Sequence, residues 1–130
     1  MILLVDDDEA VRKFVRLILE RAGYGVTEAA NAAEALRYVE THAPPPELLL
    51  TDIVMPGMNG IALAARAHKL QPALHVLFMS GFAQDFAREL SGCVCVSKPF
   101  KEAELLSAVQ AAIGRPSAEG SASPEAGKTH

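Results

Sequence analysis

The sequence predicts an α/β fold built on a doubly wound, five-stranded parallel sheet. Five short apolar runs alternate with amphipathic helical patterns along residues 1–114, which is the arrangement of a parallel sheet covered by helices on both faces. The run at 48–50 consists of leucines alone, as expected for a central strand that is buried on both sides. Polar or charged residues follow four of the runs, at the strand ends where sheets of this kind bind ligands.

Each predicted element has a local signal in the sequence. The strands are predicted at residues 2–5, 26–30, 48–51, 74–79 and 93–97. About five helices are predicted, at 9–22, between Asn31 and the prolines at 44–46, and at 61–70, 84–90 and 101–113. Asn31 and Glu34 have the spacing of a capping box. The helix at 84–90 is short and has the weakest pattern.

The first helix, at 9–22, has a wide apolar stripe that we expect to face the sheet. Its members recur at helical spacing and are Val11, Phe14, Val15, Ile18, Leu19 and Ala22. Gly23 and Gly25 end this helix before the second strand.

Composition predicts one soluble domain followed by a tail. The chain has 130 residues and a net charge of −4, so the basic surface of a nucleic-acid-binding protein is not expected. No apolar stretch approaches the roughly 20 residues of a membrane span, and we find no signal peptide, so we expect a cytoplasmic protein. Residues 115–130 are rich in Ser, Ala, Gly and Pro, which predicts a disordered tail after a domain at 1–114.

The two cysteines, Cys93 and Cys95, stand two positions apart in the last predicted strand and should face the same way. A metal site would need further thiols or histidines at ligand spacing, and the sequence has none nearby. We interpret both cysteines as small buried side chains in a reduced protein.

Residues whose side chains could bind a ligand or react follow four of the predicted strands. Asp6 and Asp7 follow the first strand, Asp52 the third, Ser80 the fourth and Lys98 the fifth. Because the carboxyl ends of parallel strands share one edge, these residues should converge. Three carboxylates repel one another and favour a bound cation, and a hydroxyl and an ammonium group suit a phosphoryl group. The sequence therefore predicts a pocket for a divalent cation and a phosphoryl group.

Taken together, these motifs resemble the receiver domain of two-component response regulators of the chemotaxis-regulator type. The resemblance covers residues 1–114 and implies a flavodoxin-like sheet with strand order 2-1-3-4-5. The motifs that carry it are Leu4-Val5-Asp6-Asp7, Asp52-Ile53-Val54-Met55-Pro56-Gly57-Met58-Asn59-Gly60, Ser80-Gly81 and Lys98-Pro99-Phe100. No single motif is specific, but their joint order after successive strands is.

The resemblance implies an acceptor and a cofactor. Asp52 is implied as the phosphoacceptor, whose carboxylate attacks phosphorus and forms an acyl phosphate. Mg²⁺ is implied as the cofactor, with Asp7 as a direct ligand and Asp6 acting through water. Asp52 itself and the carbonyl of Val54 would complete the protein ligands.

The remaining residues of the pocket are implied to bind the phosphoryl group and to switch. Ser80 would donate a hydrogen bond to a phosphoryl oxygen, beside Gly81, which leaves room for the group. Lys98 would pair with the acceptor and neutralise the transferred charge, and the bond to Pro99 would be cis. Cys95 stands where many receivers have an aromatic switch residue, so aromatic switching is not expected.

We expect a signalling domain rather than an enzyme, phosphorylated by a sensor histidine kinase or a histidine phosphotransfer protein. The start at Met1 favours a free-standing regulator, and the alternative is the terminal receiver of a hybrid histidine kinase. An Mg²⁺-dependent aspartyl phosphohydrolase is less favoured, because the cap insertion and downstream acidic pair are missing. A nucleotide-binding domain is also less favoured, because the sequence has neither a Gly-x-Gly-x-x-Gly motif after the first strand nor a P-loop. We expect a monomer or a weak phosphorylation-dependent dimer, with no membrane or direct nucleic-acid partner; the sequence does not identify the downstream target.

Overall fold

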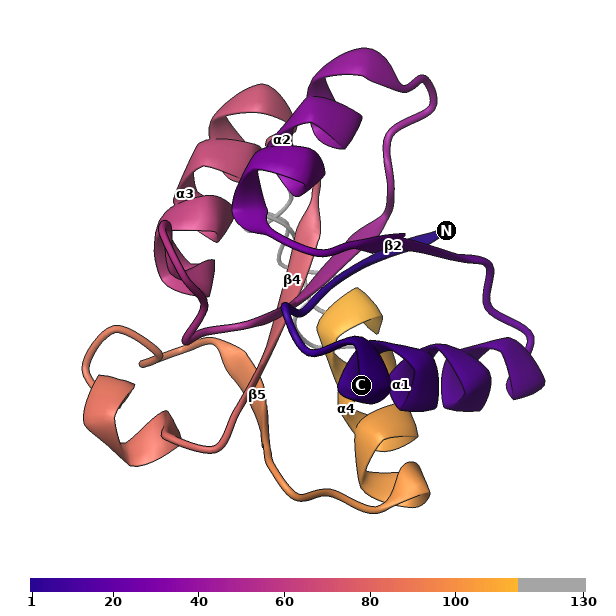
Figure 1. Ribbon diagram of the computed structural model, residues 1–130, viewed down its shortest axis with the longest axis vertical. Helices are drawn as coiled ribbons and strands as arrows, with labels where there is room; N and C mark the ends of the chain where they lie inside the picture. The colour runs from indigo at the N-terminus through magenta and orange to yellow at the C-terminus, as the bar shows by residue number, and fades with distance from the viewer. Residues whose placement is uncertain (115–130) are drawn as a thin grey trace.

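The computed structural model describes residues 1–114, apart from the side chain of Ala83, and the predicted tail lies outside this range. A parallel sheet lies between two layers of helices (Figure 1). Its strands are β1 (Ile2–Val5), β2 (Val26–Ala29), β3 (Leu48–Asp52), β4 (His75–Ser80) and β5 (Val94–Ser97). The α-helices are α1 (Glu9–Arg21), α2 (Ala32–Thr41), α3 (Gly60–Leu70) and α4 (Glu102–Gly114).

The strand order is β2-β1-β3-β4-β5 and every pairing is parallel, so the predicted fold class and order are confirmed. Every residue of β1 and β3 is buried, because these strands lie inside the sheet and have helices over both faces. None of the helices in residues 1–114 combines the length and apolarity needed to cross a bilayer.

Alternate residues of β1 enter two separate cores. Leu3 and Val5 pack in the core under α2 and α3, whereas Ile2 and Leu4 pack in the core under α1 and α4. Figure 1 shows the same division, with α2 and α3 on one side of the sheet and α1 and α4 on the other. Fully burying one such side chain stabilises the fold by roughly 1.5–3 kcal/mol. The two cores therefore hold the strands, and with them their carboxyl ends, in place.

Side-chain caps start the helices close to the strand ends. Asp8 accepts hydrogen bonds from the backbone N–H groups of Ala10 and Val11 at the start of α1. Asn59 accepts one from Ala62 at the start of α3, 2.8 Å away. Because each cap satisfies free helical N–H groups, both helices can begin beside the predicted pocket.

The helix predicted at 84–90 does not form. In the described chain, residues 81–93 contain a short 3-10 helix, Ala83–Phe86, followed by turns, so the count is four α-helices and this 3-10 turn. Leu90 is the one buried side chain among the described side chains of 84–90, and Phe86 is half-buried. This segment therefore has too little apolar surface to hold a helix against the sheet.

Three residues predicted to be buried are exposed: Phe14, Cys93 and Ala22, which caps the C-terminus of α1. Phe14 is 52% exposed, because it lies at the margin of the α1 stripe, whose buried centre is Val15, Ile18 and Leu19. Cys93 is exposed because it precedes β5 and belongs to the turn before it, whereas Cys95 is half-buried within the strand.

Candidate functional site

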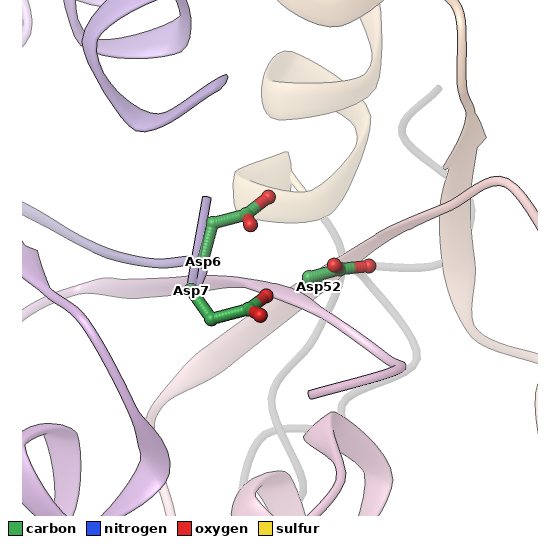
Figure 2. Close-up of side chains that lie close together, drawn as sticks. All are labelled: Asp6, Asp7 and Asp52. Carbon is green, nitrogen blue, oxygen red and sulfur yellow. The ribbon is translucent and has the colours of Figure 1, made fainter. Parts of the chain in front are cut away.

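The carboxyl ends of the strands bring the predicted residues together. Asp6 and Asp7 follow β1, and Asp52 is the last residue of β3 beside it. One carboxylate oxygen from each of the three lies within 4.8 Å of the others. Figure 2 shows the three side chains gathered at this edge of the sheet. The convergence expected from the sequence is therefore present.

Asp6 is fully buried and held at both carboxylate oxygens. Its Oδ1 accepts a hydrogen bond from the N–H of Asp8, 2.9 Å away, and its Oδ2 lies 2.9 Å from Lys98 Nζ. A buried carboxylate needs such partners, since an unpaired one would be strongly disfavoured. In this form of the protein Asp6, rather than Asp52, is the closer partner of the lysine.

Asp52 is buried at the end of β3 with its carboxylate facing the pocket. Its Oδ1 accepts a hydrogen bond from the N–H of Ile53, and its Oδ2 lies 3.3 Å from Lys98 Nζ. Burial raises the pKa of Asp52; Lys98 opposes that effect, and the charge of Asp6 adds to it. The net pKa lies above the ordinary 3.8, because desolvation of the carboxylate is the largest influence.

This pKa shift predicts that Asp52→Asn stabilises the protein without Mg²⁺. A carboxyl group whose pKa is raised by folding favours the folded state at low pH, and that contribution is lost as pH rises above 3.8 through the raised value. At neutral pH the charged form therefore opposes folding, and asparagine removes this cost while its oxygen can still accept from Ile53. We expect the variant to melt a few degrees higher at pH 7 in chelator, with the difference disappearing in acid. A wild type that melts higher under both conditions would contradict this expectation.

Lys98 joins the two buried acids. Burial lowers its pKa, but the hydrogen bond to Asp6 and the charge of Asp52 outweigh burial, so the pKa lies above the ordinary 10.5 and the lysine is charged. Its backbone N–H donates to the carbonyl of Ser80, 2.9 Å away, which ties the end of β5 to the end of β4. The peptide bond between Lys98 and Pro99 is cis, as the resemblance implied.

Ser80 and Gly81 border a hollow of about 340 Å³ beside Lys98. Ser80 is buried, and its Oγ accepts a hydrogen bond from the N–H of Phe82, 2.9 Å away. A Cβ at Gly81 would meet no described atom within 4 Å, so the described residues leave open space on this side of the pocket. The arrangement leaves room for a small group between the hydroxyl and the lysine.

The residues present suit a hard divalent cation. Asp6, Asp7 and Asp52 offer three carboxylates, and Lys98 compensates one of their charges, so two negative charges remain at the site. Mg²⁺ prefers oxygen ligands and is commonly held by one or two carboxylates together with water and phosphate. Val54, whose carbonyl is a predicted ligand, directly follows Ile53 after β3 and is half exposed.

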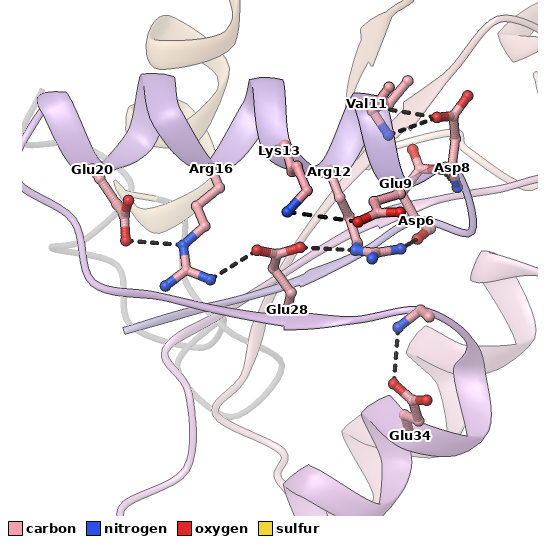
Figure 3. A network of polar contacts seen from close by, with 12 residues as sticks. Asp6, Asp8, Glu9, Val11, Arg12, Lys13, Arg16, Glu20, Glu28 and Glu34 are labelled. Atoms are coloured by element: carbon pink, nitrogen blue, oxygen red, sulfur yellow. Dashed lines mark hydrogen bonds and ion pairs between the residues drawn. The ribbon is translucent and has the colours of Figure 1, made fainter.

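Sequence reasoning missed Arg12. Its guanidinium donates to the backbone carbonyl of Asp6, 2.8 Å away, and to the carboxylate of Glu28 in β2, 2.9 Å away (Figure 3). An arginine near the start of an amphipathic helix is ordinarily a solvated surface residue, so no signal in the sequence distinguishes this one.

Comparison with known sequences identifies the family. The profile of the response regulator receiver domain matches residues 2–110. The response regulator receiver protein CpdR of Brucella abortus (strain 2308) is 41% identical over 116 residues, covering 84% of this chain and 92% of that protein. The sensor kinase CckA of the same organism is 36% identical over 113 residues, which cover 84% of this chain and 12% of CckA.

Solved structures agree with the sequence comparison. A CheY-like receiver domain protein from Methanospirillum hungatei JF-1 has a TM-score of 0.77 and 34% identity, over 86% of this chain and 91% of that one. The receiver domain of the hybrid histidine kinase CckA has a TM-score of 0.74 and 33% identity, over 86% and 97%. On its fold, its strand-end motifs and these matches, the chain belongs to the response regulator receiver domain family.

Proposed function

We propose that the protein accepts a phosphoryl group on Asp52 in a two-component phosphorelay, with Mg²⁺ as cofactor. The observation that carries the proposal is the position of the Asp52 carboxylate. One of its oxygens lies within 4.8 Å of carboxylate oxygens of Asp6 and Asp7, and its Oδ2 lies 3.3 Å from Lys98 Nζ. A nucleophilic carboxylate with acids on one side and a cation on the other suits attack on a negatively charged phosphoryl group.

The chain's own residues account for the transfer. A carboxylate oxygen of Asp52 forms a bond to phosphorus while the P–N bond of a phosphohistidine breaks and its electron pair goes to the imidazole nitrogen. Lys98 neutralises charge on the phosphoryl oxygens, and Ser80 donates its hydroxyl hydrogen to one of them, since its contact with Phe82 uses only Oγ as an acceptor. When bound, Mg²⁺ would neutralise phosphoryl charge and carboxylate repulsion.

The donor is proposed to be a sensor histidine kinase or a histidine phosphotransfer protein. An apolar hollow of about 450 Å³ lies directly beside Lys98 and offers such a protein a contact surface. It is lined by Val11, Phe14, Lys98, Pro99 and Phe100. Phe14, which was predicted to face the sheet but is half exposed, forms part of this surface and would contact the donor there.

We further propose that the protein is a free-standing cytoplasmic signalling domain. Phosphorylation would shift its equilibrium between two conformations, and a downstream target would bind one of them. The relative CpdR supports a free-standing regulator, because the match spans most of that protein. The alternative is the terminal receiver of a hybrid histidine kinase, which the match to CckA supports. Cys95 in β5 takes the place of an aromatic switch residue, so the switch would not depend on an aromatic rotamer.

The proposal is tested by intact-mass spectrometry on the wild-type protein with a small donor. Acetyl phosphate or phosphoramidate with Mg²⁺ should add one phosphoryl group, about 80 Da, and a chelator should abolish the gain. The phosphohydrolase alternative predicts instead that donor is consumed rapidly while the protein mass stays unchanged. A mass gain that persists in chelator would contradict the assignment of the acids to Mg²⁺.

A further inference from the structure

Arg12 connects three elements at the edge of the acidic cluster. It lies on α1, and its side chain is 14% exposed. Its Nη1 donates to the carbonyl oxygen of Asp6 at 2.8 Å, and its Nε donates to Glu28 Oε1 in β2 at 2.9 Å. Figure 3 shows the guanidinium between the β1 end and Glu28. Arg12 therefore donates to the backbone between Asp6 and Asp7, but within residues 1–114 it forms no hydrogen bond or ion pair with either carboxylate.

The bond to Asp6 fixes the peptide that leads into Asp7. The carbonyl of Asp6 and the N–H of Asp7 belong to one planar unit, so holding the carbonyl sets the direction in which the chain leaves β1. Within residues 1–114 no group donates to the Asp7 carboxylate, which is exposed. The position of that carboxylate beside Asp6 and Asp52 therefore depends on its backbone.

Glu28 anchors the arginine. It accepts from Arg16 Nη1 at 2.8 Å as well as from Arg12, and Arg16 is itself paired with Glu20 at 3.0 Å. The hydrogen bond from Arg16 and then that from Arg12 lower the pKa of Glu28, so it is anionic at neutral pH. The ion pair between Glu28 and Arg12 Nε restricts the Arg12 guanidinium to one orientation, and this pair remains when Arg16 is replaced.

We propose that Arg12 is a positioning residue for the metal ligands, which holds the Asp6–Asp7 peptide so that the three carboxylates converge before the cation binds. The inference rests on the proposed function, because it takes Asp6, Asp7 and Asp52 as the Mg²⁺ ligands. It assigns Arg12 to Mg²⁺ affinity and not to the transfer of the phosphoryl group, since its guanidinium bonds to neither the acceptor nor the lysine.

The test compares Arg12→Met with Arg16→Met for Mg²⁺ affinity, obtained from the rise of the melting temperature with Mg²⁺ concentration. Both variants lose one positive charge near the site, and Coulomb attraction alone would make both bind Mg²⁺ more tightly. If Arg12 positions the ligands, Arg12→Met should instead bind Mg²⁺ about tenfold more weakly, as loss of an outer partner of metal ligands does. Arg16→Met should keep the wild-type affinity or exceed it.

A rate measurement separates positioning from catalysis. Arg12→Met should need a higher Mg²⁺ concentration for phosphorylation by acetyl phosphate but should approach the wild-type rate at saturation. If the methionine variant does not fold, Arg12→Gln against Arg16→Gln is the same comparison with polar replacements. Equal or tighter Mg²⁺ binding by a folded Arg12 variant would overturn the inference. A wild type that neither binds Mg²⁺ nor gains a phosphoryl group would instead refute the proposed function, so the two failures are distinct.

Discussion

Replacing Gly60 with alanine should lower stability by about 3 kcal/mol, through overlap of the new methyl group with the backbone of Asp52. A Cβ at this position would collide with the carbonyl oxygen of Asp52 and would lie 3.0 Å from its carbonyl carbon. It would also lie 3.1 Å from Cα of Ile53, and none of these atoms belongs to a side chain that can turn away. Helix α3 would have to move from the sheet at the site itself.

Thermal denaturation followed by circular dichroism measures this effect. The melting temperature of Gly60→Ala should fall by 10 °C or more, since about 1 kcal/mol corresponds to several degrees in a domain of this size. Gly114→Ala is the matched control, because that glycine is the last described residue of α4 and a Cβ there would meet no atom of residues 1–114 within 4 Å. The control should melt at the wild-type temperature or slightly above it. If the two variants melt together, the close packing of α3 on Asp52 is wrong.

Replacing Lys98 with methionine should change metal binding and phosphorylation in opposite directions. The variant leaves three carboxylates without their ammonium, so Mg²⁺ should bind more tightly than in the wild type. The phosphorylation rate at saturating Mg²⁺ should nevertheless fall about 100-fold, because a cation at the developing phosphoryl charge is lost. Without Mg²⁺ the variant should also melt lower, since the buried Asp6 loses its ion pair.

Lys101→Met is the control for a change of charge alone. Lys101 is exposed, and its side chain forms no ion pair with the described residues. Mg²⁺ affinity and the rate with acetyl phosphate should both stay within about twofold of the wild type, since an exposed charge is screened by salt and water. A Lys98→Met protein that binds Mg²⁺ more weakly, or that is phosphorylated at the wild-type rate, would remove the lysine from the proposed mechanism.

The sheet and the convergence of its strand ends could be predicted, because local patterns determine them. Continuous apolarity at 48–50 predicts a central strand, and β3 is buried throughout. Once the strands are parallel, the positions of Asp6, Asp52 and Lys98 follow from topology, since each lies at the carboxyl end of its strand. The approach of Lys98 to the acids follows in the same way, although its closer contact with Asp6 does not.

The features that the sequence did not predict depend on tertiary context. The segment 84–90 has helical residues, but burial in the fold decides whether they form a helix, and most of its described side chains are exposed. Arg12 pairs with Glu28, sixteen positions away on another element, and no local pattern reports such a pair. The contact between Gly60 and the Asp52 backbone likewise appears once α3 is packed on the sheet.

The central claim is that Asp52 carries the phosphoryl group, and chemical mapping of the acceptor tests it most directly. Borohydride reduces an acyl phosphate to an alcohol and so converts the modified aspartate into homoserine, which mass spectrometry of peptides can locate. After phosphorylation with Mg²⁺ and a small donor, we predict homoserine at position 52 and aspartate at Asp6 and Asp7. The Asp52→Asn protein should gain no phosphoryl group and yield no homoserine. Homoserine at another position, or a phosphoryl group that survives in Asp52→Asn, would contradict the account.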